Sequence, residues 1–139
     1  MIDVTILLFN ASLPSTALTP LEIFASAGTL WGRLTRTAGA PRFRVRTATI
    51  DRRKTTHHLP IRLEPTLALA DVRRTDLVIV PAIGEDLERG LNANRRVIEW
   101  LSRRSRTTAI AGICSGVMML AEAGLLDGRP ATTHWAMID

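Results

Sequence analysis

Residues 111–116 read AGICSG and join an apolar run to a segment with the pattern of a short helix that stops at Gly124. A tight strand-to-helix turn here places Cys114 at its apex. Gly112 and Gly116 suit such an elbow, because the backbone on either side of a strained residue comes close to its neighbours. We therefore predict that Cys114 stands at the N-terminus of a helix, where the helix dipole favours a thiolate.

The chain has a single cysteine, so Cys114 cannot form an intramolecular disulfide and a Cys-rich metal site is excluded. Taken alone, the Gly-x-Cys-x-Gly pattern fits a small buried core thiol as well as a reactive one. His57 and His58 lie in a polar loop, and we interpret them as a solvated pair rather than as metal ligands. We predict neither a metal nor a cofactor for this chain.

Four other stretches have strand patterns. Residues 2–9 and residues 76–82 are nearly continuous apolar runs, which is typical of strands buried on both faces of a parallel sheet. Residues 43–50 alternate apolar and polar side chains, and residues 60–69 form a weaker extended stretch. We predict that the last two stretches lie at the periphery of the sheet.

A helix start is indicated by Thr19, Pro20 and Glu22, which fit the N-cap, N1 and N3 positions. The helix is predicted to run toward Leu34. Its apolar residues fall on one stripe, so we expect an amphipathic helix that packs on the sheet. The stripe consists of Leu21, Phe24, Ala25, Gly28 and Trp31.

A second helix is predicted from Asn92 or Asn94 to Arg104. Strands and helices therefore alternate along the chain. This alternation predicts an α/β fold, a three-layer sandwich of the flavodoxin-like type with a mainly parallel sheet covered on both faces. The length of 139 residues and the hydrophobic content of 46% fit one domain, residues 1–139.

Composition narrows the class of function. The net charge of +5 comes from arginines that are dispersed in short groups without a recognition-helix pattern, so we interpret them as a solvated surface. No stretch approaches the roughly 20 apolar residues that span a bilayer, and the first residues lack a basic leader. We predict a cytoplasmic protein without membrane contact.

The segment AGICSGVMMLAEAGLLDGRPATTHW, residues 111–135, closely resembles the elbow region of the ThiJ/PfpI, or class I glutamine-amidotransferase-like, superfamily. The match to the branch linked to AraC-family transcription regulators is especially close. The resemblance implies an amidotransferase-like α/β domain. It also implies that the domain is incomplete relative to the family and truncated at its C-terminal end, and that the helix-turn-helix DNA-binding domain lies outside this chain.

Hydrolytic members of that superfamily pair the elbow cysteine with a histidine, often the next residue, and with an acid near the first helix. In this chain Ser115 stands at the histidine position and Thr16 at the acidic one. The resemblance therefore disfavours amidase chemistry, which needs a general acid to expel an amine. Glu22 is explained by capping, and Glu85 and Asp86 are interpreted as surface charges.

The remaining site residues surround the elbow. His134 is a candidate partner of Cys114, and a packed structural histidine is an equal alternative. The N–H of Ser115 and one from the Gly84 loop are predicted to form a donor pair of oxyanion-hole type, which could equally hold a non-reacting carboxylate or amide. We predict a ligand pocket formed by Gly84, Ser115, Gly116 and Thr16.

Two functions follow from the resemblance. The first is the N-terminal ligand-sensing and dimerisation domain of an AraC-family regulator, with an unknown small-molecule ligand and with DNA contact only through the absent domain. The second is a cysteine-dependent hydratase or hydrolase of small isocyanide- or amide-like molecules. We expect a homodimer, because a truncated domain leaves apolar surface uncovered.

Overall fold

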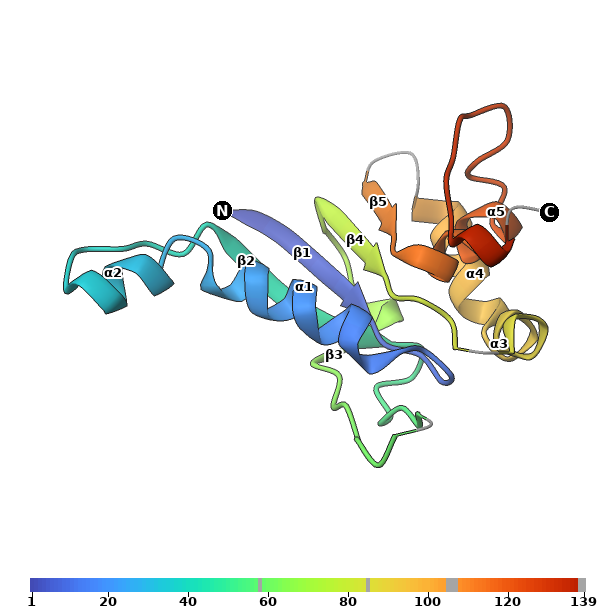
Figure 1. Cartoon of the computed structure of the whole chain (residues 1–139), viewed down its shortest axis with the longest axis horizontal. Helices are drawn as coiled ribbons and strands as arrows, with labels where there is room; N and C mark the ends of the chain where they lie inside the picture. The colour runs from blue at the N-terminus through green and yellow to red at the C-terminus, as the bar shows by residue number, and fades with distance from the viewer. Residues whose placement is uncertain (58, 85, 105–107, 138–139) are drawn as a thin grey trace.

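The computed structural model describes residues 1–57, 59–84, 86–104 and 108–137. Five parallel strands form one sheet in the order β3-β2-β1-β4-β5, which confirms the predicted α/β class (Figure 1). β1 lies at the centre, between β2 and β4. The strands are β1 (Ile2–Leu7), β2 (Phe43–Thr49), β3 (Leu67–Ala68), β4 (Leu77–Val80) and β5 (Ala109–Gly112).

Helices cover both faces of the sheet. α1 packs on one face against β1 and β2, whereas α4 and α5 lie on the other face, and α2 projects beyond the sheet (Figure 1). The helices are α1 (Pro14–Ser26), α2 (Leu30–Thr35), α3 (Leu87–Ala93), α4 (Arg95–Arg104) and α5 (Val117–Glu122). None of the described helices combines the length and apolar character needed to cross a membrane.

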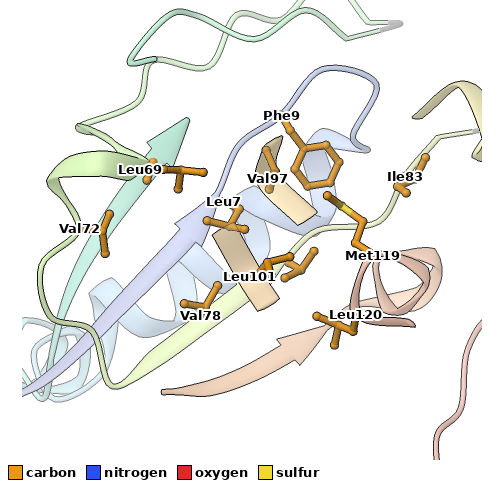
Figure 2. Close-up of a cluster of buried hydrophobic side chains, with 12 residues drawn as sticks. Leu7, Phe9, Leu69, Val72, Val78, Ile83, Val97, Leu101, Met119 and Leu120 are labelled. Atoms are coloured by element: carbon orange, nitrogen blue, oxygen red, sulfur yellow. The ribbon is translucent and has the colours of Figure 1, made fainter. Parts of the chain in front are cut away.

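Two apolar layers hold the sandwich together. On the α4 and α5 face, Leu7 and Val78 from the sheet meet Leu101 of α4 and Met119 of α5, and Figure 2 shows these side chains converging. On the opposite face, Ile6 packs with residues of α1. Each fully buried aliphatic side chain contributes about 1.5 to 3 kcal/mol, so the two layers account for much of the driving force for folding.

The predicted start of the first helix is wrong. α1 begins at Pro14, which occupies a first-turn position, and Pro20 lies inside the helix. Thr19 and Glu22 are exposed, and neither caps a helix. The sequence Thr-Pro-x-Glu has the pattern of a capping box but lies inside the helix. The helix begins earlier because Ala17, which is 1% exposed, packs against the sheet and stabilises the turn that starts at Pro14.

The first helix also ends earlier than predicted. α1 stops at Ser26, because Gly28 adopts a left-handed φ of 84° and turns the chain before α2. A Cβ at Gly28 would lie 2.2 Å from the carbonyl oxygen of Ala40. Phe24 packs as expected, with its ring edge-on to Phe43 at 4.8 Å, but Trp31 on the predicted stripe is 75% exposed.

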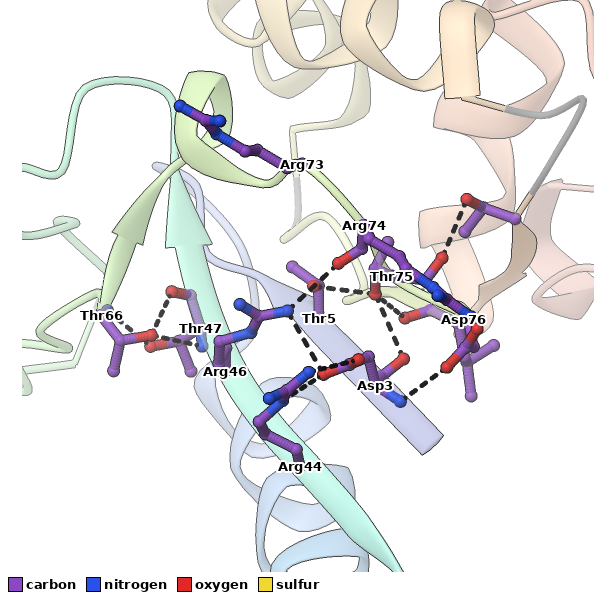
Figure 3. Close-up of polar contacts among 12 residues, drawn as sticks. Asp3, Thr5, Arg44, Arg46, Thr47, Thr66, Arg73, Arg74, Thr75 and Asp76 are labelled. Atoms are coloured by element: carbon purple, nitrogen blue, oxygen red, sulfur yellow. Dashed lines mark hydrogen bonds and ion pairs between the residues drawn. The ribbon is translucent and has the colours of Figure 1, made fainter. Parts of the chain in front are cut away.

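β2 is not peripheral, since it pairs with β1 from Phe43 to Ala48 and with β3 on its other side. Its alternating polar residues were interpreted as one solvated face. Arg44 and Arg46 instead reach the buried carboxylate of Asp3, with the Arg44 Nε 2.5 Å from Oδ1 (Figure 3). The short stretch at residues 60–69 does supply the edge strand β3, as predicted.

The helix predicted from Asn92 or Asn94 to Arg104 is confirmed as α4. Sequence patterning missed α3, which precedes it and has only seven residues. Asp86 begins α3 by accepting a hydrogen bond from the backbone N–H of Arg89 at 2.9 Å. Asp86 is therefore a helix cap as well as an exposed charge, and its neighbour Glu85 lies outside the described residues.

Candidate functional site

Cys114 sits at the predicted elbow. β5 ends at Gly112, and a 3₁₀ turn over Cys114–Gly116 leads into α5. Cys114 has a φ of 53°, an uncommon value for a residue with a side chain, and its side chain is exposed. The prediction of a strained cysteine at the apex of a strand-to-helix turn is confirmed, and the alternative of a buried core thiol is wrong.

Both glycines of the elbow are required by close approach of the backbone. A Cβ at Gly116 would lie 2.4 Å from the carbonyl oxygen of Pro81, and a Cβ at Gly112 would lie 2.9 Å from the backbone of Val117. These contacts press the elbow against the end of β4 and against the start of α5. Gly116 is consequently part of the scaffold of the site.

Ser115 fastens the elbow to the loop after β4. Its side-chain hydroxyl donates to the carbonyl oxygen of Ile83 at 2.8 Å, and the residue is only 2% exposed. The hydroxyl is therefore engaged within the protein, where a superfamily hydrolase would place a histidine ring. The predicted role of the Ser115 N–H as an anion donor stays a prediction.

Thr16 holds the same loop from the α1 side. Its hydroxyl donates to the carbonyl oxygen of Leu13 at 2.7 Å and accepts from the N–H of Ala82 at 3.0 Å. The structure thus brings Thr16 and Ser115 to the two sides of one loop, residues 81–84. In this state the Thr16 hydroxyl supports the loop, and its predicted contact with a ligand stays a prediction.

The N–H of Gly84 itself is already used within the protein, and the predicted donor from the Gly84 loop stays a prediction. The Gly84 N–H donates to the carbonyl oxygen of Ala11 at 2.7 Å, as part of a bridge between Ser12 and Ile83. An oxyanion hole that uses the Gly84 N–H would require this bond to break. The sequence indicates that this loop follows a central strand. It does not indicate the direction of the Gly84 N–H, because that direction depends on a hydrogen bond to Ala11, which is far away in sequence.

His134 does not contact the cysteine through a hydrogen bond in the part of the chain that the structure describes. Its Nδ1 accepts from the N–H of Ala136 at 3.3 Å, and its ring centroid lies 5.4 Å from that of Trp135. Trp135 is 78% exposed and His134 is half-buried, and the contact between their rings agrees with the alternative of a packed histidine. The bond that reaches the elbow comes from Thr133, whose hydroxyl donates to the carbonyl oxygen of Cys114 at 3.2 Å.

Thr133 was missed as a site residue, although it belongs to the Thr-Thr-His-Trp sequence that marks the resemblance. A cavity of about 260 Å³ adjoins it, beside α5. The lining is mainly apolar and does not include Cys114: Val117, Met118, Ala121, Leu126, Ala131, Thr132, Thr133 and Met137. An apolar cavity next to an exposed thiol can hold the hydrophobic part of a small ligand.

The other candidate residues lie away from the elbow. His57 is not solvated as predicted, because its ring nitrogens contact the Thr55 hydroxyl at 2.8 Å and the Ser12 carbonyl oxygen at 2.9 Å. His58 lies outside the described residues. Across residues 1–57, 59–84, 86–104 and 108–137, no three histidine, cysteine or acidic side chains gather in a way that could hold a metal ion.

A parallel α/β sheet in which a strand ends at an exposed cysteine with positive φ defines a domain of the nucleophile-elbow class. Comparison with known families identifies it more closely, since the DJ-1/PfpI family pattern matches residues 4–139. The chain belongs to the DJ-1/PfpI family.

Two curated relatives are similar to parts of the chain. The chain is 42% identical over 73 residues to the HTH-type transcriptional regulator CdhR of Pseudomonas aeruginosa, a match that covers 52% of the chain and 21% of CdhR. It is 30% identical over 83 residues to the isonitrile hydratase of Pseudomonas putida, which covers 57% of the chain and 34% of the hydratase. The matches thus span about a third or less of each relative.

Solved structures support the fold. Toxoplasma gondii DJ-1, oxidized, superimposes with a TM-score of 0.72 at 17% identity, covering 100% of the chain and 70% of the other. An AraC family transcriptional regulator from Pseudomonas putida gives a TM-score of 0.63 at 20% identity, covering 99% of the chain and 69% of the other. The chain is therefore shorter than these structural neighbours.

Proposed function

We propose that this chain is the ligand-sensing and dimerisation domain of an AraC-type transcription regulator, in which the elbow serves as a binding pocket. The observation that carries this proposal is that the side-chain hydroxyls of Ser115 and Thr16 are hydrogen-bonded to the main chain. Both hydroxyls hold the loop at residues 81–84, so neither the position next to the cysteine nor the position near the first helix supplies an acid or base. The 42% identity to CdhR supports the regulatory assignment.

The proposed pocket combines an exposed thiol with the apolar cavity beside α5. A small ligand would place its apolar part in that cavity and its polar part at the elbow, near the Thr133 hydroxyl and the Ser115 N–H. Because Ser115 and Thr16 both bind loop 81–84, a ligand that moved the elbow would also shift α1. This connection gives the domain a route from the pocket to a distant surface.

The second candidate function is a cysteine-dependent hydratase or hydrolase of small isocyanide- or amide-like molecules. It is favoured by the exposure and strain of Cys114, which are typical of elbow nucleophiles, and by the similarity to the isonitrile hydratase. The two functions differ in whether the thiol reacts during turnover.

Alkylation tests the accessibility of Cys114, and substrate turnover separates the two functions. We expect iodoacetamide to alkylate the native chain at one site, since the sequence holds a single cysteine and it is exposed, and we expect no modification of the Cys114→Ala variant. Mass spectrometry of the intact protein measures the modification. The native chain should not turn over acetamide or tert-butyl isocyanide, because Ser115 and Thr16 stand where a base and an acid are expected and both hydroxyls are bound to the main chain.

Turnover that disappears in the Cys114→Ala variant would overturn the sensing proposal and establish the enzymatic one. Cys114→Ser serves as the matched control, because it keeps a small polar side chain at the elbow. Circular dichroism of both variants verifies that the fold is retained.

We propose that two copies of the chain associate through the α1–α2 region. Ile23 is 61%, Trp31 75% and Leu34 70% exposed, and Figure 1 shows α2 projecting from the sheet. Large apolar side chains that gather on a surface are typical of an interface. We propose further that contact with DNA is made by a domain outside residues 1–139.

Light scattering coupled to size exclusion should give the mass of a dimer at micromolar concentration. The double variant Trp31→Glu, Leu34→Glu should give the mass of a monomer, because a buried unpaired charge opposes association. Leu59→Glu serves as control and should remain dimeric, because Leu59 is also 43% exposed but lies between β2 and β3, outside the α1–α2 region. A folded native monomer at that concentration would refute the proposal.

A further inference from the structure

A second cavity lies at the carboxyl ends of β1 and β2, away from the elbow. Its volume is about 250 Å³, and its walls come from the loops after the two strands and from the junction of α3 and α4. β1 lies where the chain order of the sheet reverses, with β2 on one side and β4 on the other. In open parallel sheets, ligands bind outside the carboxyl ends of strands at this kind of position. None of the residues that line the cavity belongs to the elbow or to α5.

Positive charge dominates the lining. Arg53, Lys54 and Arg96 contribute three cations and Asp51 contributes one carboxylate. Lys54 also pairs with Glu64, an exposed residue outside the lining. Arg96 makes no side-chain hydrogen bond or ion pair with any residue that the structure describes. Arg53 pairs with Asp51 at 3.4 Å, but both side chains are exposed, and such surface pairs are weak enough to be exchanged for a ligand.

Polar groups in the wall of the cavity are held in place or left without a partner. Asn94 is buried and donates from Nδ2 to the carbonyl oxygens of Asn10 at 3.1 Å and Gly90 at 2.7 Å, which fixes the start of α4 against the loop after β1. Thr49 also lines the cavity. Its hydroxyl is buried and has no hydrogen-bond partner among the described residues, and a ligand oxygen could satisfy it.

From this geometry we propose that the cavity binds the phosphate group of a small phosphorylated metabolite. Guanidinium and ammonium groups bind phosphate oxygens through charge-assisted hydrogen bonds. The volume admits a phosphate with a small organic part. The site is separate from the elbow pocket, so the domain would respond to a second ligand that does not touch Cys114.

Calorimetric titration of the 139-residue chain with glycerol 3-phosphate, at constant ionic strength, tests this site. We expect saturable binding with one site per chain, and about tenfold weaker binding in Arg96→Gln and in Lys54→Gln, because each loses a charged donor. Arg103→Gln, which removes the same charge from the far end of α4, is the matched control and should bind like the native chain. Cys114→Ala should also bind normally.

Titrations with inorganic phosphate and with succinate distinguish the sources of negative charge. We expect inorganic phosphate to compete with glycerol 3-phosphate, and succinate to compete at least about tenfold less well, because three donors match a tetrahedral anion better than a planar carboxylate. Thr49→Val should weaken phosphate binding without lowering thermal stability, since the native hydroxyl has no partner among the described residues. The proposal is overturned if the native chain does not bind at millimolar ligand, or if Arg103→Gln weakens binding as much as Arg96→Gln.

Discussion

Gly116→Ala should lower the free energy of unfolding by at least about 3 kcal/mol, the upper range for overpacking a core. The new Cβ would meet the carbonyl oxygens of Pro81 at 2.4 Å and Val80 at 2.6 Å. Both atoms belong to the backbone at the end of β4, so neither can turn aside as a flexible side chain could. Urea denaturation followed by tryptophan fluorescence measures the loss.

Gly128→Ala is the matched control, because a Cβ there meets nothing within 4 Å, although its φ of 69° disfavours a side chain. Gly128→Ala should lower the free energy of unfolding by only about 1 kcal/mol, because only the unfavourable positive φ opposes the new side chain. Gly116 has an ordinary helical φ of −61°, so the larger loss of stability in Gly116→Ala would come only from the contacts of the new Cβ with the backbone of β4. Equal losses in the two variants would show that the elbow is not pressed against β4.

The elbow could be predicted from sequence because its requirements are local. A short apolar strand, two small residues and a helix stop all lie within residues 108–124, and each has its own pattern. The strand order could not be derived in the same way. The alternating pattern of β2 resembles that of an edge strand, and only the pairing of Arg44 and Arg46 with Asp3 shows why charged residues are tolerated beside β1.

The site was predicted in part for the same reason. Cys114 and Ser115 were found because they are neighbours in sequence, whereas Thr133 and the engaged state of Gly84 depend on hydrogen bonds between distant segments. Thr16 was located by its spacing from Pro20, but its double hydrogen bond could not be read from that spacing. Contacts across the fold therefore decide what each predicted residue does.

These contacts also bear on the choice between sensing and catalysis. An elbow enzyme needs groups that are free to exchange protons with the substrate, whereas Ser115 and Thr16 are bound to the main chain on both sides of one loop. A hydroxyl that is hydrogen-bonded to the main chain is not free to exchange protons with a substrate, but it does join the segments that it contacts. The same hydrogen bonds that weaken the enzymatic proposal give the sensing proposal its mechanical connection to α1.

The amino ends of the strands carry a polar network of a different kind, and Asp3 is its centre (Figure 3). The Asp3 carboxylate accepts from Arg44 Nε and Nη2 at 2.5 and 2.6 Å, and Arg46 Nη2 lies 3.4 Å away. The backbone N–H of Asp3 donates to Asp76 Oδ2 at 2.8 Å. Asp3 is only 5% exposed, so the network links β1 to β2 and to the segment before β4 from a buried position.

Asp3→Asn should therefore lower the free energy of unfolding by about 2 kcal/mol at neutral pH, the range for hydrogen bonds to a charged group. The amide keeps the shape of the side chain but loses the charge that both arginines bind. Urea denaturation of both proteins measures the difference. Glu64→Gln is the control: Glu64 pairs with Lys54 through side chains that are 70% and 56% exposed, so its loss should change stability little.

The pH dependence of that difference tests the cause. The hydrogen bonds from Arg44, with the charges of nearby guanidinium groups, hold the pKa of the Asp3 carboxyl below its ordinary value of 3.8, although burial opposes them. A carboxyl whose pKa is lower in the folded state stabilises the fold above its unfolded pKa, and this contribution is lost as the pH falls through the folded pKa. The stability difference between the native chain and Asp3→Asn should thus stay constant above about pH 5 and shrink below about pH 4. A difference that persists unchanged in acid would mean that the substituted amide disturbs packing, and that the charge of Asp3 contributes little.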